Sequence, residues 1–96
     1  PLSIAPKPLD FVLVGAGFWA PFHLHGWREL GGTHCVGIVD LQPEKASSLA
    51  AQFGVANHGE HLDRFLAEHR VDFVDIVTSP NTHRELVEIC AAHGVR

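Results

Sequence analysis

The chain has 96 residues, of which 46% are hydrophobic and 19% are charged, and its net charge is −4. This length allows a single domain, and the apolar fraction excludes a disordered chain. The negative charge argues against binding to nucleic acid or to an anionic membrane surface, and no apolar run approaches the roughly 20 residues that a membrane-spanning helix needs.

The first eight residues hold three of the six prolines. We expect an irregular tail at 1–8 and the domain at 9–96. The tail lacks the charged start and apolar middle of a signal peptide. The two cysteines, Cys35 and Cys90, have apolar neighbours, so we interpret them as buried thiols in a reducing compartment, which favours a cytoplasmic protein. A disulfide between them is the alternative, because sequence does not show their separation.

Strand and helix patterns alternate along the rest of the chain. Short apolar runs that end at turn residues are typical of strands buried on both faces, as in a parallel sheet. We expect strands at 11–14, 35–39, 55–57 and 71–77. Apolar residues at helical spacing predict helices at 21–30, 43–53, 62–69 and 82–93. The last helix has the clearest start, since Thr82 and Glu85 fit a capping box.

Four β–α units in a row predict an α/β domain with a Rossmann-like, doubly wound parallel sheet. Right-handed crossovers place helices on both faces, and the expected strand order is 3-2-1-4. A fifth strand is expected after Arg96, so we interpret the domain as incomplete.

The string Gly15 to Ala20 reads G-x-G-x-x-A and joins a predicted strand to a predicted helix, which is the context of the dinucleotide fingerprint. Gly15 permits a tight turn, Gly17 leaves room for a pyrophosphate, and Ala20 lets the helix pack closely. The helix start then offers free amides and partial positive charge to the phosphates. An ordinary strand-to-helix turn is the alternative.

Asp40 ends the second predicted strand, 20 residues after Ala20. Dinucleotide folds place a carboxylate there against the adenosine ribose. The same carboxylate would repel a ribose 2′-phosphate, and the neighbouring Leu41 and Gln42 are not basic. We therefore predict NAD as the cofactor, in preference to NADP. Alternatively, Asp40 only supports the turn into the helix at Pro43.

The segment 78–83 follows the fourth strand, at the edge where open α/β sheets bind ligands. Thr82 is interpreted there as a helix cap. For His83, the sequence favours neither a ligand contact nor a purely structural role. The eight histidines lack the spacing and the partners of a metal site, so no metal is predicted. The sequence has neither a Gly-Lys-Ser/Thr phosphate loop nor a G-x-S-x-G nucleophile turn.

In their order and spacing, these motifs resemble the Gfo/Idh/MocA oxidoreductases, which include glucose–fructose oxidoreductase and inositol dehydrogenase. The string G-A-G-F-W-A-P-F-H, with His23 in the first helix, is similar to the first turn of that family. The string G-I-V-D at Asp40 resembles its second strand. The string I-V-T-S-P-N-T-H is similar to its I-A-T-P-P-x-x-H segment, from which Ser79 departs.

The resemblance implies NAD(P)-dependent oxidation or reduction of a sugar, cyclitol or similar polyol. It places on the nicotinamide side Thr78, Pro80, Asn81 and His83. It places on the adenosine–pyrophosphate side Gly15, Gly17, Phe18, Trp19 and Asp40. The catalytic Lys of the family lies in an E-K-P motif after the next strand, so we expect no catalytic residue in this chain.

Two other functions remain open: a non-catalytic dinucleotide-binding regulatory module, and a Rossmann-like domain for another adenine nucleotide.

The predicted strand 71–77 forms an edge of the sheet with no Lys or Pro to discourage pairing with another chain, and only the charges of Asp72 and Asp75 oppose such pairing. We therefore expect self-association into a homo-oligomer.

Overall fold

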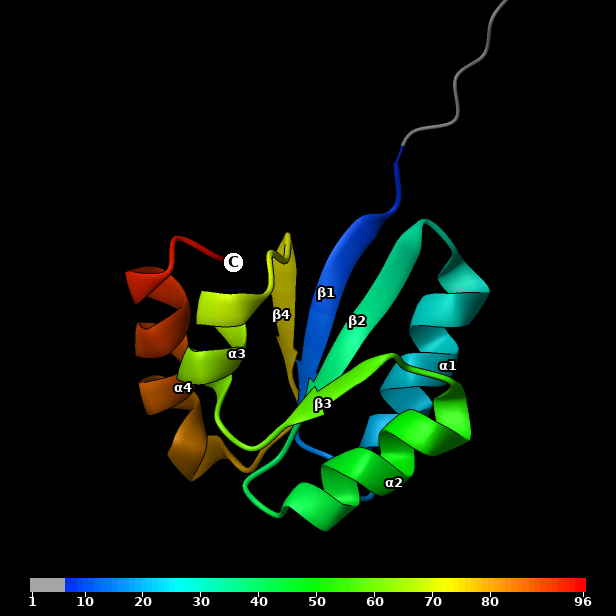
Figure 1. Ribbon diagram of the computed structural model, residues 1–96, viewed down its shortest axis with the longest axis horizontal. Helices are drawn as coiled ribbons and strands as arrows, with labels where there is room; N and C mark the ends of the chain where they lie inside the picture. The colour runs from blue at the N-terminus through cyan, green and yellow to red at the C-terminus, as the bar shows by residue number, and fades with distance from the viewer. Residues whose placement is uncertain (1–6) are drawn as a thin grey trace, which may run out of the picture.

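The computed structural model describes residues 7–96, which form a four-stranded parallel sheet flanked by four helices (Figure 1). The elements are β1 Leu9–Val14, α1 Ala20–Leu30, β2 Thr33–Val39, α2 Pro43–Phe53, β3 Asn57–Gly59, α3 Leu62–Glu68, β4 Phe73–Ile76 and α4 Pro80–Ala92. The strand order β3-β2-β1-β4 confirms the predicted Rossmann-like α/β fold. Most of the predicted tail, residues 1–6, lies outside the described residues.

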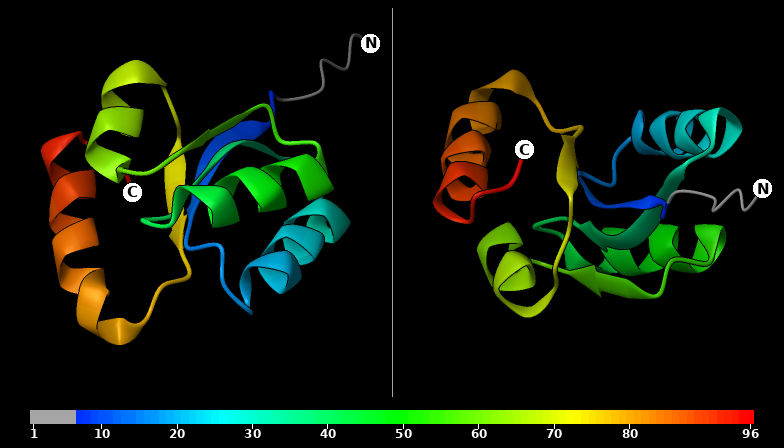
Figure 2. Two further views of the ribbon diagram at one scale, coloured as in Figure 1. Left: turned by 60° about the horizontal axis from the view of Figure 1, so that its bottom comes forward. Right: turned by 90° about the horizontal axis from the view of Figure 1, so that it is seen from above.

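Helices cover both faces of the sheet because the central strand β1 is apolar on both (Figure 2). Phe11 and Leu13 pack in one core with residues of α1 and α2. Val12 and Val14 pack in a second core with residues of α3 and α4. All four of these β1 side chains are buried. The alternation along β1 therefore produces the three layers expected of a parallel sheet.

One close contact fixes α3 against the sheet. The Phe65 ring of α3 lies directly over Gly37 of β2, where an added Cβ would come within 2.2 Å of the ring. Only glycine leaves room for the ring at this position. Because α3 follows directly after Glu60 and His61, the contact also fixes the loop that carries these two residues.

The start of α4 differs from the sequence prediction. The capping box at Thr82 is wrong, because α4 begins at Pro80 and the residue before it is Ser79. Proline suits the first helical position, where no amide hydrogen is needed. Thr82 instead lies in the first turn, and its hydroxyl donates to the Ser79 carbonyl oxygen at 2.9 Å. Strands β3 and β4 also differ, since the sequence placed them at 55–57 and 71–77.

The outer edge of β4 is partly paired within the chain. The Val74 amide donates to the Arg96 carbonyl oxygen at 2.7 Å. The two acidic residues expected to protect this edge also make internal hydrogen bonds. Asp72 accepts from the Asp10 amide at 2.8 Å, and Asp75 accepts from side chains of α1. Self-association through this edge stays a prediction.

Candidate functional site

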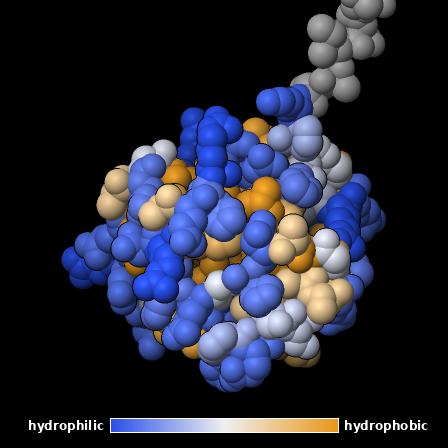
Figure 3. All heavy atoms as spheres, in the orientation of Figure 1, coloured by the Kyte–Doolittle hydropathy of each residue, from blue (hydrophilic) through white to orange (hydrophobic). Residues whose placement is uncertain are grey.

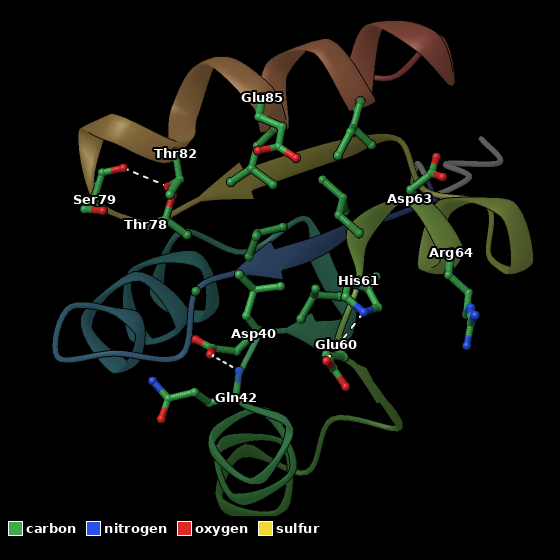
Figure 4. A pocket seen from close by; sticks show the side chains of 17 residues that line it. Asp40, Gln42, Glu60, His61, Asp63, Arg64, Thr78, Ser79, Thr82 and Glu85 are labelled. Atoms are coloured by element: carbon green, nitrogen blue, oxygen red, sulfur yellow. Dashed lines mark hydrogen bonds and ion pairs between the residues drawn. The ribbon is translucent and has the colours of Figure 1, made fainter.

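Residues that follow all four strands line one cavity of about 800 Å³ at the carboxyl edge of the sheet (Figure 4). They are Gly15 after β1, Asp40 after β2, Glu60 after β3 and Thr78 after β4. Apolar side chains complete the lining: Val14, Val39, Leu41, Leu62, Leu86 and Ile89. In Figure 3, apolar residues come to the surface near the middle of a mostly polar face. An apolar cavity with a few polar groups is typical of a small-molecule site.

Gly15 is required by the close approach of two strand ends. Its φ of 108° lies in the region that favours glycine, and an added Cβ would lie 2.9 Å from the Val77 carbonyl oxygen. The Thr78 methyl group would lie 3.1 Å from the same Cβ. Gly15 therefore lets the turn after β1 pack directly against the end of β4.

Gly17 has the opposite environment, because no atom lies within 4 Å of the position of an added Cβ. This open space lies just before α1. Within the first turn, the Ala20 amide donates to the Gly17 carbonyl oxygen at 3.2 Å and Pro21 has no amide hydrogen, so the attraction for anions comes mainly from the partial positive charge of the helix start. Ala20, which is fully buried, lets α1 pack closely on the sheet. The turn therefore has the space and the charge to accept a phosphate group.

Asp40 connects the turn after β1 with the turn after β2. Its Oδ2 accepts a hydrogen bond from the Ala16 amide at 2.7 Å, and its Oδ1 accepts one from the Gln42 amide at 2.8 Å. The contact with Gln42 supports the turn into the helix at Pro43, as the alternative interpretation expected, and the contact with Ala16 also supports the turn after β1. Each carboxylate oxygen has a further lone pair, so both can still accept from a ligand hydroxyl.

The loop between β4 and α4 is held by its own side chains. The Thr78 and Thr82 hydroxyl oxygens lie 2.7 Å apart, and Thr78 donates in this pair because the Thr82 proton goes to the Ser79 carbonyl oxygen. His83 Nε2 contacts the Thr78 carbonyl oxygen at 3.0 Å. Ser79 donates to the Asn81 side-chain oxygen. Thr78, Ser79 and Thr82 line the cavity, as Figure 4 shows. Pro80, Asn81 and His83 do not line it.

Phe18 and Trp19 directly follow the glycine turn, residues 15–17, and do not line the cavity. Both are exposed, and together with the exposed Phe22 they form an aromatic cluster with ring centroids 5.1–5.6 Å apart. The structure therefore groups the predicted residues in three places. Gly15, Asp40 and Thr78 line the cavity, while the others lie at the start of α1 or of α4.

Several residues that line the cavity were not predicted from the sequence. Glu60, His61 and Leu62 follow β3, whose carboxyl end had been placed at Asn57 instead of Gly59. The sequence pattern that could have indicated them is a polar loop directly after a weakly predicted strand. Glu85, Leu86 and Ile89 share one face of α4 with Thr82, at helical spacing, and this pattern was available from the sequence.

Two further properties concern residues 7–96 only. Within this range, no three His, Cys, Asp or Glu side chains gather in a way that could hold a metal ion. None of the helices in the described part of the chain has the length and apolarity needed to cross a bilayer.

A parallel sheet in the order 3-2-1-4, an open glycine turn before α1 and an acidic end of β2 together define a dinucleotide-binding domain. The family described as "Oxidoreductase family, NAD-binding Rossmann fold" matches residues 9–96. The chain belongs to this family, the Gfo/Idh/MocA oxidoreductases, which confirms the resemblance.

Known relatives agree with this assignment. The chain is 36% identical over 89 residues to D-apiose dehydrogenase of Paraburkholderia graminis, covering 93% of this chain and 24% of that protein. It is 33% identical to 4-carboxy-2-hydroxymuconate-6-semialdehyde dehydrogenase of Sphingobium sp., covering 90% and 27%.

A solved oxidoreductase from Agrobacterium radiobacter, in complex with NAD+, L-tartaric acid and magnesium, superimposes with a TM-score of 0.87. It is 35% identical in sequence, and the match covers 93% of this chain and 26% of that one. The chain thus spans about a quarter of the length of the relatives that it matches.

Proposed function

We propose that the chain binds the dinucleotide cofactor of a dehydrogenase at the carboxyl edge of its sheet. The adenosine occupies the cavity, with its ribose hydroxyls on Asp40, and the pyrophosphate lies over Gly17 at the start of α1. The nicotinamide then extends toward the loop that carries Thr78, Pro80, Asn81 and His83. Phe18 and Trp19 follow Gly17 in the chain and lie on the pyrophosphate side.

The observation that carries this proposal is the position of the Asp40 carboxylate. Two backbone amides orient it, and one of them belongs to Ala16, inside the glycine turn. A ribose on Asp40 would therefore have its phosphate side directed to the open space over Gly17. On its other side lies the apolar part of the cavity, formed by Leu62 and Leu86 among others, which suits an adenine ring.

We further propose that NAD is preferred to NADP. The Asp40 carboxylate accepts ribose hydroxyls but repels a 2′-phosphate, and the adjacent Leu41 and Gln42 supply no positive charge. Calorimetric titration of the protein with NAD and NADP tests this preference. Asp40→Asn should weaken NAD about tenfold, in the range of hydrogen bonds to a charged acceptor, and should narrow the gap to NADP.

The matched control is Glu85→Gln, which removes one negative charge from the same cavity but away from Asp40. It should leave the ratio of NAD to NADP affinity unchanged. If both variants change this ratio equally, the overall charge of the cavity sets the preference and Asp40 has no special role.

For the full-length protein, we propose oxidation or reduction of a sugar, cyclitol or similar polyol, as the name of the D-apiose dehydrogenase relative suggests. The bound nicotinamide would accept or donate the hydride, and the residues described above orient it. Turnover assays of the full-length protein with aldoses and cyclitols, followed by NADH absorbance, test this activity. NAD binding without turnover of any polyol would favour a regulatory module.

The two free cysteines favour our proposal that the protein resides in a reducing compartment such as the cytoplasm. Both Cys35 and Cys90 are free thiols in the structure, and Cys90 is buried. The protein should be isolated without added reductant and then unfolded. Quantitative titration of its thiols should give two reactive thiols per chain.

A further inference from the structure

A polar cluster between α1 and β4 lies outside the cavity. The Asp75 side chain of β4 accepts two hydrogen bonds at its Oδ2, from Trp27 Nε1 at 2.8 Å and from His23 Nδ1 at 2.9 Å. A carboxylate can only accept, so His23 donates through Nδ1. The Asp75 side chain is only 14% exposed. Losing its donors would leave a nearly buried carboxylate without partners, which is costly.

The cluster joins the two segments that flank the proposed pyrophosphate and nicotinamide positions. His23 lies in the first turn of α1, where its amide donates to the Trp19 carbonyl oxygen at 3.2 Å. Trp27 lies one turn further along and packs its ring against Phe73 of β4, with centroids 5.1 Å apart. Asp75 therefore attaches the start of α1 to the strand that leads into the loop at Thr78.

The same two segments already touch at a second point. Asp75 lies two residues before Val77, whose carbonyl oxygen packs against Gly15. The spacing between the glycine turn and the β4–α4 loop is thus fixed by a backbone contact at Gly15 and by a side-chain connection at Asp75. The ribose position at Asp40 lies after β2, on the opposite side of β1 from β4.

We infer that Asp75 is a positioning residue for the dinucleotide. Through His23 and Trp27 it holds the first turn of α1 at the distance from β4 that lets one pyrophosphate–nicotinamide unit contact both segments. This inference rests on the proposed placement of the pyrophosphate over Gly17. It implies that the cluster acts on the nicotinamide mononucleotide part of the ligand, with its own phosphate, and not on the adenosine monophosphate part.

The experiment compares NAD with AMP, each titrated calorimetrically into the purified protein. In Asp75→Asn, whose amide oxygen still accepts but carries no charge, and in His23→Ala, which loses one donor, the Kd for NAD should rise about five- to tenfold, because hydrogen bonds to a charged group are the stronger ones. The Kd for AMP should stay within about twofold of the wild-type value, since AMP lacks the parts that span the two segments. His23→Asn should recover most of the NAD affinity, because its amide nitrogen can replace Nδ1 as the donor.

The matched control is Asp72→Asn, one residue before the same strand. Asp72 also accepts a hydrogen bond, from the Asp10 amide at 2.8 Å, but at the amino end of β4. This variant should lose stability in urea without any change in NAD affinity. If Asp75→Asn does not fold, Trp27→Phe serves instead, because it keeps an aromatic ring and removes the Nε1 donor.

The outcomes separate the two proposals. If the wild-type protein binds NAD and Asp75→Asn binds it equally well, the positioning role is overturned and the proposed function stands. Equal losses for NAD and AMP also overturn it, because they indicate a general structural role. If the wild-type protein binds neither ligand, the proposed function fails and this inference fails with it.

Discussion

Three Gly→Ala substitutions separate the structural and ligand-binding roles of the glycine turn. At Gly15, alanine would adopt a φ of 108°, which costs about 1–3 kcal/mol. Its methyl group would also lie 2.9 Å from the Val77 carbonyl oxygen, and such overpacking adds about 1–3 kcal/mol. Gly15→Ala should therefore lower the free energy of unfolding by about 2 kcal/mol or more, and the Tm by at least roughly 8 °C.

At Gly17, alanine should leave the fold unchanged, because no atom lies within 4 Å of the new methyl group. The methyl group would instead occupy the space proposed for the pyrophosphate. We expect the Kd for NAD to rise at least about tenfold, which corresponds to about 1.4 kcal/mol. Gly26→Ala, in open space on α1, is the control. It should raise the free energy of unfolding by about 1 kcal/mol and leave the Kd unchanged.

Urea unfolding followed by the fluorescence of Trp19 and Trp27 gives the stabilities, and calorimetric titration gives the affinities. Wild-type NAD affinity in Gly17→Ala would refute the placement of the pyrophosphate over this residue. A wild-type urea midpoint in Gly15→Ala would refute the close packing between the ends of β1 and β4.

Two further predictions concern the packing of the sheet. Gly37→Ala should lower the free energy of unfolding by about 1–3 kcal/mol, because the methyl group would overlap the Phe65 ring. In a double-mutant cycle, Phe65→Leu should relieve part of this loss. If the two changes in the free energy of unfolding simply add, the contact between these residues is contradicted. Burial raises the pKa of the Cys35 and Cys90 thiols. Their neutral forms therefore favour the folded state, so this contribution to stability should be lost as the pH rises above about 8.5, where the unfolded thiols ionise first. Urea midpoints of the wild type and of Cys35→Ala between neutral and alkaline pH check this, and equal pH dependence would count against a contribution from Cys35.

The fold could be predicted because the informative residues act locally. Phe11 to Val14 form an uninterrupted apolar run, and a glycine turn follows, which is enough to indicate a buried parallel strand. β3 carried no such pattern, since it consists of Asn57, His58 and Gly59. It becomes a strand through its pairing with the end of β2, which no local window reveals.

The start of α4 shows how two local signals can compete. Thr82 and Glu85 fit a capping box, but Pro80 already has the φ of a helical residue and needs no amide partner. The helix therefore starts two residues earlier, and Thr82 becomes part of its first turn. Glu85, the other residue of the predicted capping box, lines the cavity instead.

The candidate site was predictable where a motif fixes both the position and the chemistry, as at Gly15 and Asp40. The contact of Asp40 with the Ala16 amide depends on how two turns meet in space. Similarly, Asp75 and His23 are 52 residues apart, and only the packing of α1 against β4 brings them together. Long-range side-chain pairs of this kind leave no periodic signal in the sequence.

A crystal structure of the protein with bound NAD tests the central claim most directly. We predict that the adenosine ribose hydroxyls lie within hydrogen-bond distance of the Asp40 carboxylate, with the adenine in the cavity and the pyrophosphate over Gly17. A pyrophosphate bound away from the start of α1, or a ribose without contact to Asp40, would contradict the account.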